Sequence, residues 1–177
     1  IIQAAYRLIH KADTIIAGIF IGATGVTVYA IPVILIDQFR MFAETGNYIL
    51  TPRFSRLAAS HDLATTSTLL LKWSRYSSIL AITIGTPLLV SGGDFIQLWM
   101  GPEFAACGPI LQLLTIPFFF TLPSMVFIYY FYATNQHRTN AIILLAEAAI
   151  NIGLSILLVQ KFGLPGIALA TLLPALV

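Results

Sequence analysis

Charge is what this sequence has least of. Only 9% of its 177 residues are Asp, Glu, Lys or Arg, whereas 58% are hydrophobic. Water-soluble domains carry about 25% charged residues, which cover the surface that faces water. A mean hydropathy of +0.91 excludes this chain from that class. The composition predicts an all-α polytopic membrane protein, because only helices and closed barrels span lipid and no alternating β pattern competes.

Several kinds of chemistry are missing as well. The one cysteine, Cys107, excludes an internal disulfide and any cysteine-based metal motif, and we expect it to be a small buried side chain. The sequence has no Walker A loop, no HExxH pair and no clustered acidic motif for magnesium. Its three histidines are dispersed, so no Ser–His–Asp arrangement can be argued. We therefore expect no catalytic residues, no metal, no other cofactor and no nucleic-acid partner.

The two ends of the chain are unusual for a whole protein. It begins with Ile1 and ends in the apolar run "LATLLPALV" (169–177). The start has no basic region followed by an apolar core and a small-residue cleavage site, so no signal peptide is predicted. From these ends we expect the chain to be a piece of a longer protein.

Short polar stretches divide the apolar sequence into six segments of the length that a spanning helix needs, roughly 20 residues. The predicted helices are 3–21, 26–50, 67–90, 108–133, 141–159 and 167–177, the last one cut off. Together they predict one transmembrane helical lobe over 1–177. The intervening segments 51–62 and 91–104 are interpreted as a basic and an acidic loop.

The break at Gly22–Gly25 decides the number of helices. Because Thr14–Ile36 contains no charge, an alternative is one continuous helix, which would place Asp37 at the membrane interface. With six helices, most of the cations share one side: Arg7, Lys11, Arg53, Arg56, Lys72, Arg75 and Arg138. The positive-inside rule favours this six-helix arrangement and places the loop of Arg53 and Arg56 in the cytoplasm.

Polar side chains follow one face of the predicted helix 26–50. At 100° per residue they fall within a narrow arc: Tyr29, Asp37, Arg40, Glu44, Asn47 and Thr51. Asp37 would lie about 16 Å from the outer interface, near the middle of a hydrocarbon layer of about 30 Å. A charge at that depth costs about 2.5–3.5 kcal/mol on insertion scales and normally faces the interior of a helix bundle. Two interpretations stay open: a structural clamp of ion pairs at helix spacing, or the wall of a transport path.

Two other predicted helices carry polar residues at similar depth. One face of 3–21 holds Gln3, Arg7, His10, Lys11, Thr14 and Gly18. In 141–159, Glu147 lies near mid-span and Asn151 lies one turn above it. We expect a wet cavity that carries both signs of charge.

Four stretches resemble, in order, the polysaccharide transporter family. They are "ADTIIAGIFIGATGVTVYAIPVILI", "LTPRFSRLAASHD", "FIQLWMGPEF" and "INIGLSILLVQKFGLPGIALAT". This family comprises the O-antigen and exopolysaccharide repeat-unit flippases of the multidrug/oligosaccharidyl-lipid/polysaccharide exporter superfamily. The resembling positions are Asp13 before a Gly and a Tyr, the Pro-x-x-Ser-x-Leu at Pro52, the Gly-x-x-Phe at Gly101, and Asn151 before Phe-Gly-x-x-Gly-x-Ala.

The resemblance implies two six-helix lobes around a central cavity, of which this chain matches most of the second. It implies an undecaprenyl-pyrophosphate-linked oligosaccharide as substrate, turned across the bacterial cytoplasmic (inner) membrane by alternating access. The partners would be membrane lipids, the N-terminal lobe of the same protein and glycan polymerase or assembly proteins.

Combined with the polar faces, the resemblance suggests roles for nine residues. The candidate substrate contacts are Arg7, Lys11, Arg40 and Asn47, since cations are the usual partners of phosphate oxygens. The candidates for ion coupling or charge balance are Asp13, Asp37, Glu44, Glu147 and Asn151. The alternatives are a drug/cation antiporter of the same superfamily, a membrane glycan polymerase or other glycosyl enzyme, and a purely structural membrane subunit.

Overall fold

The computed structural model of this chain describes the backbone of residues 2–60, 62–134 and 137–175, and the side chains of these residues except 2–10, 48, 58, 137, 139 and 175. Within these ranges every regular element is a helix. The elements are α1 (Ile2–Ile21), α2 (Ala23–Tyr48), α3 (Thr51–Ala59), α4 (Leu63–Met100), a 3₁₀ turn (Pro102–Phe104), α5 (Cys107–Ala133), α6 (His137–Phe162) and α7 (Leu164–Ala175).

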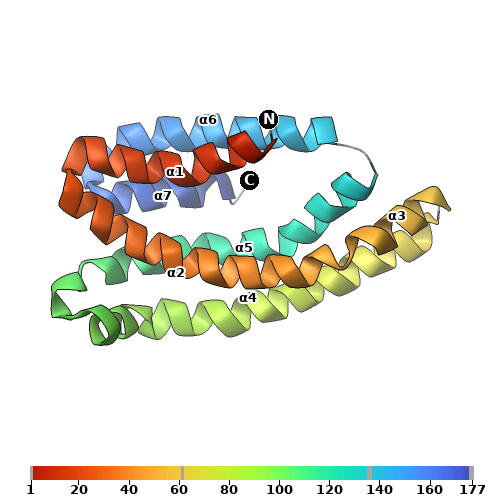
Figure 1. The fold of residues 1–177 in the computed structure, drawn as a ribbon, viewed down its shortest axis with the longest axis horizontal. Helices are drawn as coiled ribbons and strands as arrows, with labels where there is room; N and C mark the ends of the chain where they lie inside the picture. The colour runs from red at the N-terminus through yellow and green to blue at the C-terminus, as the bar shows by residue number, and fades with distance from the viewer. Residues whose placement is uncertain (1, 61, 135–136, 176–177) are drawn as a thin grey trace.

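The predicted class, an all-α polytopic membrane protein, is confirmed. Four described segments are long and apolar enough to cross a membrane: Ala23–Asn47, Leu63–Met100, Cys107–Ala133 and Asn140–Phe162. A shorter apolar helix follows at Leu164–Pro174. Figure 1 shows the helices in two groups, with α1, α6 and α7 together on one side and α2, α4 and α5 side by side on the other.

The predicted break between the first two helices is present, and it is narrower than Gly22–Gly25. It is confined to Gly22, whose φ of 90° lies in the region that favours glycine. The chain turns back there, so α2 runs beside α1 in the opposite direction (Figure 1). The alternative of one continuous helix over Thr14–Ile36 is therefore wrong.

The segment predicted as a basic loop contains a short helix, α3. Its apolar side is buried, because Phe54 and Leu50, which lies just before the helix, pack against Val126. The ring of Phe54 also meets the ring of Tyr130 edge-on, with the ring centroids 5.9 Å apart. Its basic side, with Arg53 and Arg56, is exposed. Helix α3 was not predicted, because its fully buried anchors are Leu50, which precedes it, and Phe54, and these two do not form a helical apolar pattern.

Helix α4 is longer at both ends than the predicted 67–90. It spans 38 residues, about 57 Å at 1.5 Å per residue. At its start the side chain of Asp62 accepts a hydrogen bond from the Thr65 backbone N–H at 2.9 Å and caps the helix. These hydrogen bonds from Thr65 hold the pKa of the exposed Asp62 carboxyl below its usual value. At its end the helix continues through the predicted acidic loop, because Gly93 permits a close approach to Gly108 of α5.

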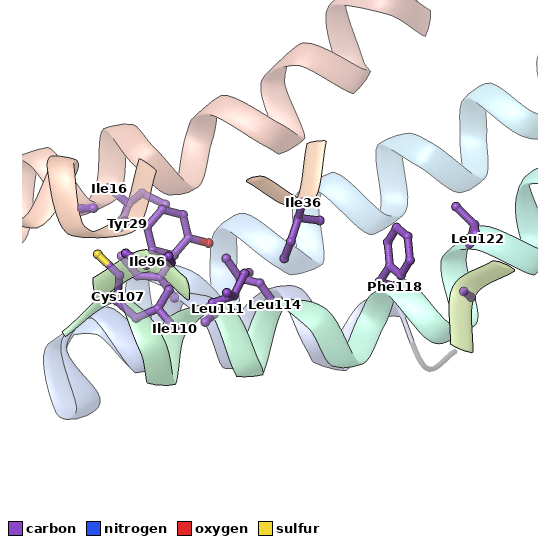
Figure 2. Close-up of a cluster of buried hydrophobic side chains, with 14 of the residues drawn as sticks. Ile16, Tyr29, Ile36, Ile96, Cys107, Ile110, Leu111, Leu114, Phe118 and Leu122 are labelled. Atoms are coloured by element: carbon purple, nitrogen blue, oxygen red, sulfur yellow. The ribbon is translucent and has the colours of Figure 1, made fainter. Parts of the chain in front are cut away.

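The hydrophobic core follows α5, which packs against α2, α4 and α7. In Figure 2 the buried side chains of α5 meet Ile16 of α1, Tyr29 and Ile36 of α2, and Ile96 of α4. Cys107 lies within this cluster and is fully buried, as predicted. The core therefore holds α1 and α2 against the end of α4 and the start of α5, which positions the polar groups described next.

Candidate functional site

Among the described side chains, Asp13 is the most enclosed charged residue, and side chains from three other helices converge on it. Its side chain on α1 is 5% exposed. The carboxylate accepts hydrogen bonds from three hydroxyls: Ser155 of α6 to Oδ1 at 2.9 Å, Thr171 of α7 to Oδ2 at 2.8 Å, and Tyr29 of α2 to Oδ2 at 3.3 Å. We call these four residues and Asn151 the Asp13 junction.

Asn151 extends the junction along α6. Its Nδ2 donates to Thr171 Oγ1 at 3.4 Å, while its buried Oδ1 has no hydrogen-bond partner. Thr171 Oγ1 also lies 3.2 Å from the Ile167 carbonyl oxygen. Because a hydroxyl has a single proton, Thr171 donates either to Asp13 or to Ile167 at one time. The junction thus contains one acceptor without a hydrogen-bond partner, Asn151 Oδ1, and one alternative acceptor for Thr171, the Ile167 carbonyl oxygen.

Local geometry explains why these residues meet. Asn151 and Ser155 are four residues apart on α6 and share one face, as Ile167 and Thr171 do on α7. The two helices reverse at Gly163, whose φ is 63°. They pack closely because a Cβ at Gly166 would strike the α6 backbone at Leu158. The glycines of the "FGLPG" stretch therefore bring Thr171 to the same depth as Asn151 and Ser155.

The described side chains around Asp13 are uncharged. They are the three hydroxyls and the Asn151 carboxamide, and among the described side chains no Lys, Arg or His forms an ion pair with Asp13. A buried carboxylate normally needs a positive partner or takes up a proton. The oxygens of carboxylate, hydroxyl, carboxamide and carbonyl are the ligands that hard cations prefer. The arrangement is therefore suited to holding either a proton or a small hard cation.

A second polar region, more open, lies on α2 and α6. Asp37, Arg40 and Glu44 of α2 and Glu147 of α6 are all half-buried. The positive charge of Arg40 acts on the carboxylates of both Asp37 and Glu147, so it faces groups on two helices. We call these four residues the Arg40 region. A guanidinium near carboxylates of two helices can bind either a carboxylate or the oxygens of an incoming phosphate.

The predicted arc on α2 thus divides into distinct environments. Tyr29 at one end is 1% exposed and belongs to the Asp13 junction. Asn47 at the other end is 5% exposed, and its Oδ1 accepts from Ser77 Oγ of α4 at 3.5 Å. In the same place the Tyr129 hydroxyl of α5 donates to the Glu44 carbonyl at 3.3 Å. Asn47, a predicted substrate contact, therefore lies in a packed contact between helices.

The predicted polar face of the first helix is also divided. Lys11 is exposed, whereas Asp13 points inward. The side chain of Arg7, another predicted substrate contact, lies outside the described residues. Of the nine predicted residues, the structure therefore brings Asp13 and Asn151 together, and it places Arg40 near Asp37 and Glu147. Glu44 follows Arg40 by four residues on α2.

Ser155 and Thr171 were not predicted. A single hydroxyl in an apolar helix is common and carries little signal by itself. The available signal was their spacing: Ser155 follows Asn151 by one turn, and Thr171 follows the Gly-x-Ala stretch. Tyr29 belongs to the predicted polar arc of 26–50, but its partner on α1 cannot be inferred from the periodicity of α2.

Comparison with known proteins gives one distant relative. A protein of Bacillus subtilis (strain 168) named "Uncharacterized membrane protein EpsK" is 26% identical over 170 residues, which cover 95% of this chain and 34% of the relative. The chain thus spans about a third of the length of that relative. No family model matches the sequence, and no solved structure matches the fold. Together with the four apolar helices, this likeness to a membrane protein indicates a multi-pass membrane protein.

Proposed function

We propose that this chain is part of a transporter that flips undecaprenyl-pyrophosphate-linked oligosaccharides across the bacterial cytoplasmic membrane, and that the Asp13 junction is its coupling-ion site. The observation that carries the proposal is a buried carboxylate held by hydroxyls from three other helices. Ionisable residues inside a membrane bundle generally mark ion or substrate paths. A site with one carboxylate and neutral oxygens suits one positive charge, either Na⁺ or a proton.

The substrate class rests on the four resembling stretches and on the Arg40 region. Arg40 is the cation of that region, and its charge is shared between Asp37 and Glu147. A pyrophosphate entering between α2 and α6 would offer stronger, charge-assisted hydrogen bonds than either carboxylate alone. The side that carries the exposed Arg53 and Arg56 then faces the cytoplasm. A second lobe of the same protein would close the cavity.

A second candidate is a drug/cation antiporter. The Arg40 region favours it in one respect, since it contains three carboxylates, Asp37, Glu44 and Glu147, beside a single guanidinium. An excess of negative charge attracts organic cations. The two candidates differ in their substrate: the flippase requires Arg40, whereas an antiporter for organic cations would work as well or better without it.

The test is complementation of glycan export. The full-length gene carrying Asp13→Asn or Arg40→Gln replaces the wild-type copy in its host, and surface glycan is measured along with the amount of protein in the membrane. Both variants are expected to lose export at normal protein levels. Matched controls are Asp94→Asn and Arg53→Gln, which change an exposed carboxylate and an exposed guanidinium elsewhere. Full export by Arg40→Gln, with increased resistance to cationic drugs, would replace the flippase by the antiporter.

A further inference from the structure

Helix α2 joins the two polar regions. It carries Asp37 and Arg40 in its middle, and near its start the Tyr29 hydroxyl donates to Asp13 Oδ2. At its other end it is bound to α4 and α5 through Asn47 and the Glu44 carbonyl. The Tyr29–Asp13 hydrogen bond is thus a polar contact through which α2 meets the helices of the junction.

Tyr29 shares its acceptor with Thr171, and its bond is the weaker of the two. Thr171 lies 2.8 Å from Oδ2, whereas Tyr29 lies 3.3 Å from the same atom. Thr171 also has the Ile167 carbonyl as an alternative acceptor. A proton or cation on Asp13 occupies one of its lone-pair sites and cancels its charge, so the remaining hydrogen bonds weaken and the weakest is the first to break. A released hydroxyl then turns its proton to another acceptor. Thr171 can do so without leaving its place.

Tyr29 cannot respond in the same way. Its ring is 1% exposed and lies among Ile16, Ile96 and Ile110 in the core, with its oxygen directed out of that cluster (Figure 2). Breaking its hydrogen bond therefore changes how the first part of α2 is held. Two weak points in the backbone lie on either side of it: Gly22 with φ of 90° before α2, and Pro32 within α2, which lacks an N–H donor.

We infer that Tyr29 is a positioning residue that transmits the occupancy of Asp13 to α2, and thereby to Asp37 and Arg40. While Asp13 is empty and ionised, Tyr29 holds the start of α2 against α1. When Asp13 is neutralised, this bond is lost and α2 is free to tilt between Gly22 and Pro32. The inference deepens the proposed function and rests on it, because it gives the coupling ion a route to the substrate-facing charges.

The experiment measures the position of α2 against α6 in the full-length protein. Spin labels are attached to cysteines replacing the exposed Met41 on α2 and Ile142 on α6, in a cysteine-free background that includes Cys107→Ala. Pulsed electron paramagnetic resonance gives the distribution of distances between the two spin labels. It is recorded for four labelled proteins: the one that keeps both Asp13 and Tyr29, D13N, Y29F and the double variant. Asp13→Asn stands for the neutralised carboxylate, so the design does not depend on knowing the ion.

We expect two populations of label distances, one for each position of α2. In the protein that keeps Tyr29, D13N is expected to change the ratio of these populations by at least about fivefold, which is the lower end of the range for coupling between two sites. In the Y29F background, D13N is expected to have no further effect, which is the signature of coupling through that hydroxyl. Ser155→Ala is the matched control. It also removes a hydroxyl from Asp13, but from α6, so D13N must still act on α2 in that background.

Equal effects of D13N with and without the Tyr29 hydroxyl would overturn the inference. So would an equal loss of coupling in S155A, which would make Tyr29 one structural contact among several. Should D13N fail to accumulate, the same distances are measured in NaCl and in N-methyl-D-glucamine chloride. The same comparison is made between high and low pH, because the ion is either Na⁺ or a proton. A response of the wild type to Na⁺ or to pH that disappears in Y29F supports the inference, and a response that persists, or no response to either ion, rejects it.

Glycan export is measured on the same proteins in parallel. If the effect of D13N on the label distances depends on Tyr29 but the wild type exports no glycan, the substrate assignment is wrong and the role of Tyr29 stands. If the wild type exports glycan but the effects of D13N and Y29F on the distances are additive, Tyr29 has no such role and the flippase proposal stands.

Discussion

The Asp13 junction and the Arg40 region surround their ionisable side chains in opposite ways. Asp13 is enclosed by three neutral hydroxyls from three other helices. Asp37, Glu44 and Glu147 stay half-buried, and Arg40 provides the positive charge beside them. Among the described side chains, the first region surrounds a carboxylate with uncharged groups, and the second holds charges of both signs. The difference is what our proposal requires, namely a closed site for a small ion beside an open face for a large substrate.

The largest effect on the contrast between the two regions is expected from removing a hydroxyl that binds Asp13. Thr171→Val keeps the volume of the side chain and deletes the 2.8 Å bond to Asp13. A hydrogen bond to a charged group contributes roughly 1.5–3 kcal/mol, so we expect the cation dependence of transport to weaken about tenfold or more. The measurement is the half-saturating Na⁺ concentration, or the pH profile if the ion is a proton, in proteoliposomes of the full-length protein.

Thr83→Val is the control for that change. Thr83 is an exposed residue of α4 whose hydroxyl bonds the Ile79 carbonyl at 2.8 Å, one turn back. The same substitution there removes a hydroxyl without touching a charge. Equal shifts in T171V and T83V would show that the Asp13 junction has no special relation to the ion.

A smaller effect is expected at the turn that brings α2 back to α1. Gly22 has φ of 90° and ψ of −168°, a combination that costs a residue with a side chain about 1–3 kcal/mol. Gly22→Ala should lower the melting temperature and loosen the Tyr29–Asp13 contact. Gly153→Ala is the matched control, because Gly153 is helical and a Cβ there meets no atom within 4 Å. Thermal unfolding in detergent measures both, and equal melting temperatures would mean that Gly22 is unstrained.

How much of this could be predicted from the sequence depends on whether the signal lies within one helix. The break at Gly22, the all-α membrane class and the mid-span charges follow from composition and from a period of 3.6 residues. The partner of Asp13 does not, because Tyr29, Ser155 and Thr171 come from three other helices and only tertiary packing selects their depth. The length of α4 could not be predicted for the same reason, because the contact between Gly93 and Gly108 joins two different helices and is visible only in the structure.

The smallest expected effect concerns Asp62, a carboxylate that also accepts hydrogen bonds from a threonine but lies in water. The bonds from Thr65 lower its pKa from the usual 3.8. A lowered pKa in the folded state contributes stability above pH 3.8, and that contribution is lost as the pH falls through the folded value. Asp62→Asn should therefore cause a small fall in melting temperature at pH 7, and the difference should shrink below pH 4. A difference that is independent of pH would contradict this account.

The central claim is that the Asp13 junction holds a positive charge, and direct ion binding tests it. Purified full-length wild-type protein and Asp13→Asn are compared for binding of radioactive Na⁺ and, by proton uptake in unbuffered solution, for binding of protons. We predict that the wild type binds one of these ions near neutral pH and that Asp13→Asn, folded by its melting curve, binds neither. Undiminished ion binding by a folded Asp13→Asn protein would contradict the account.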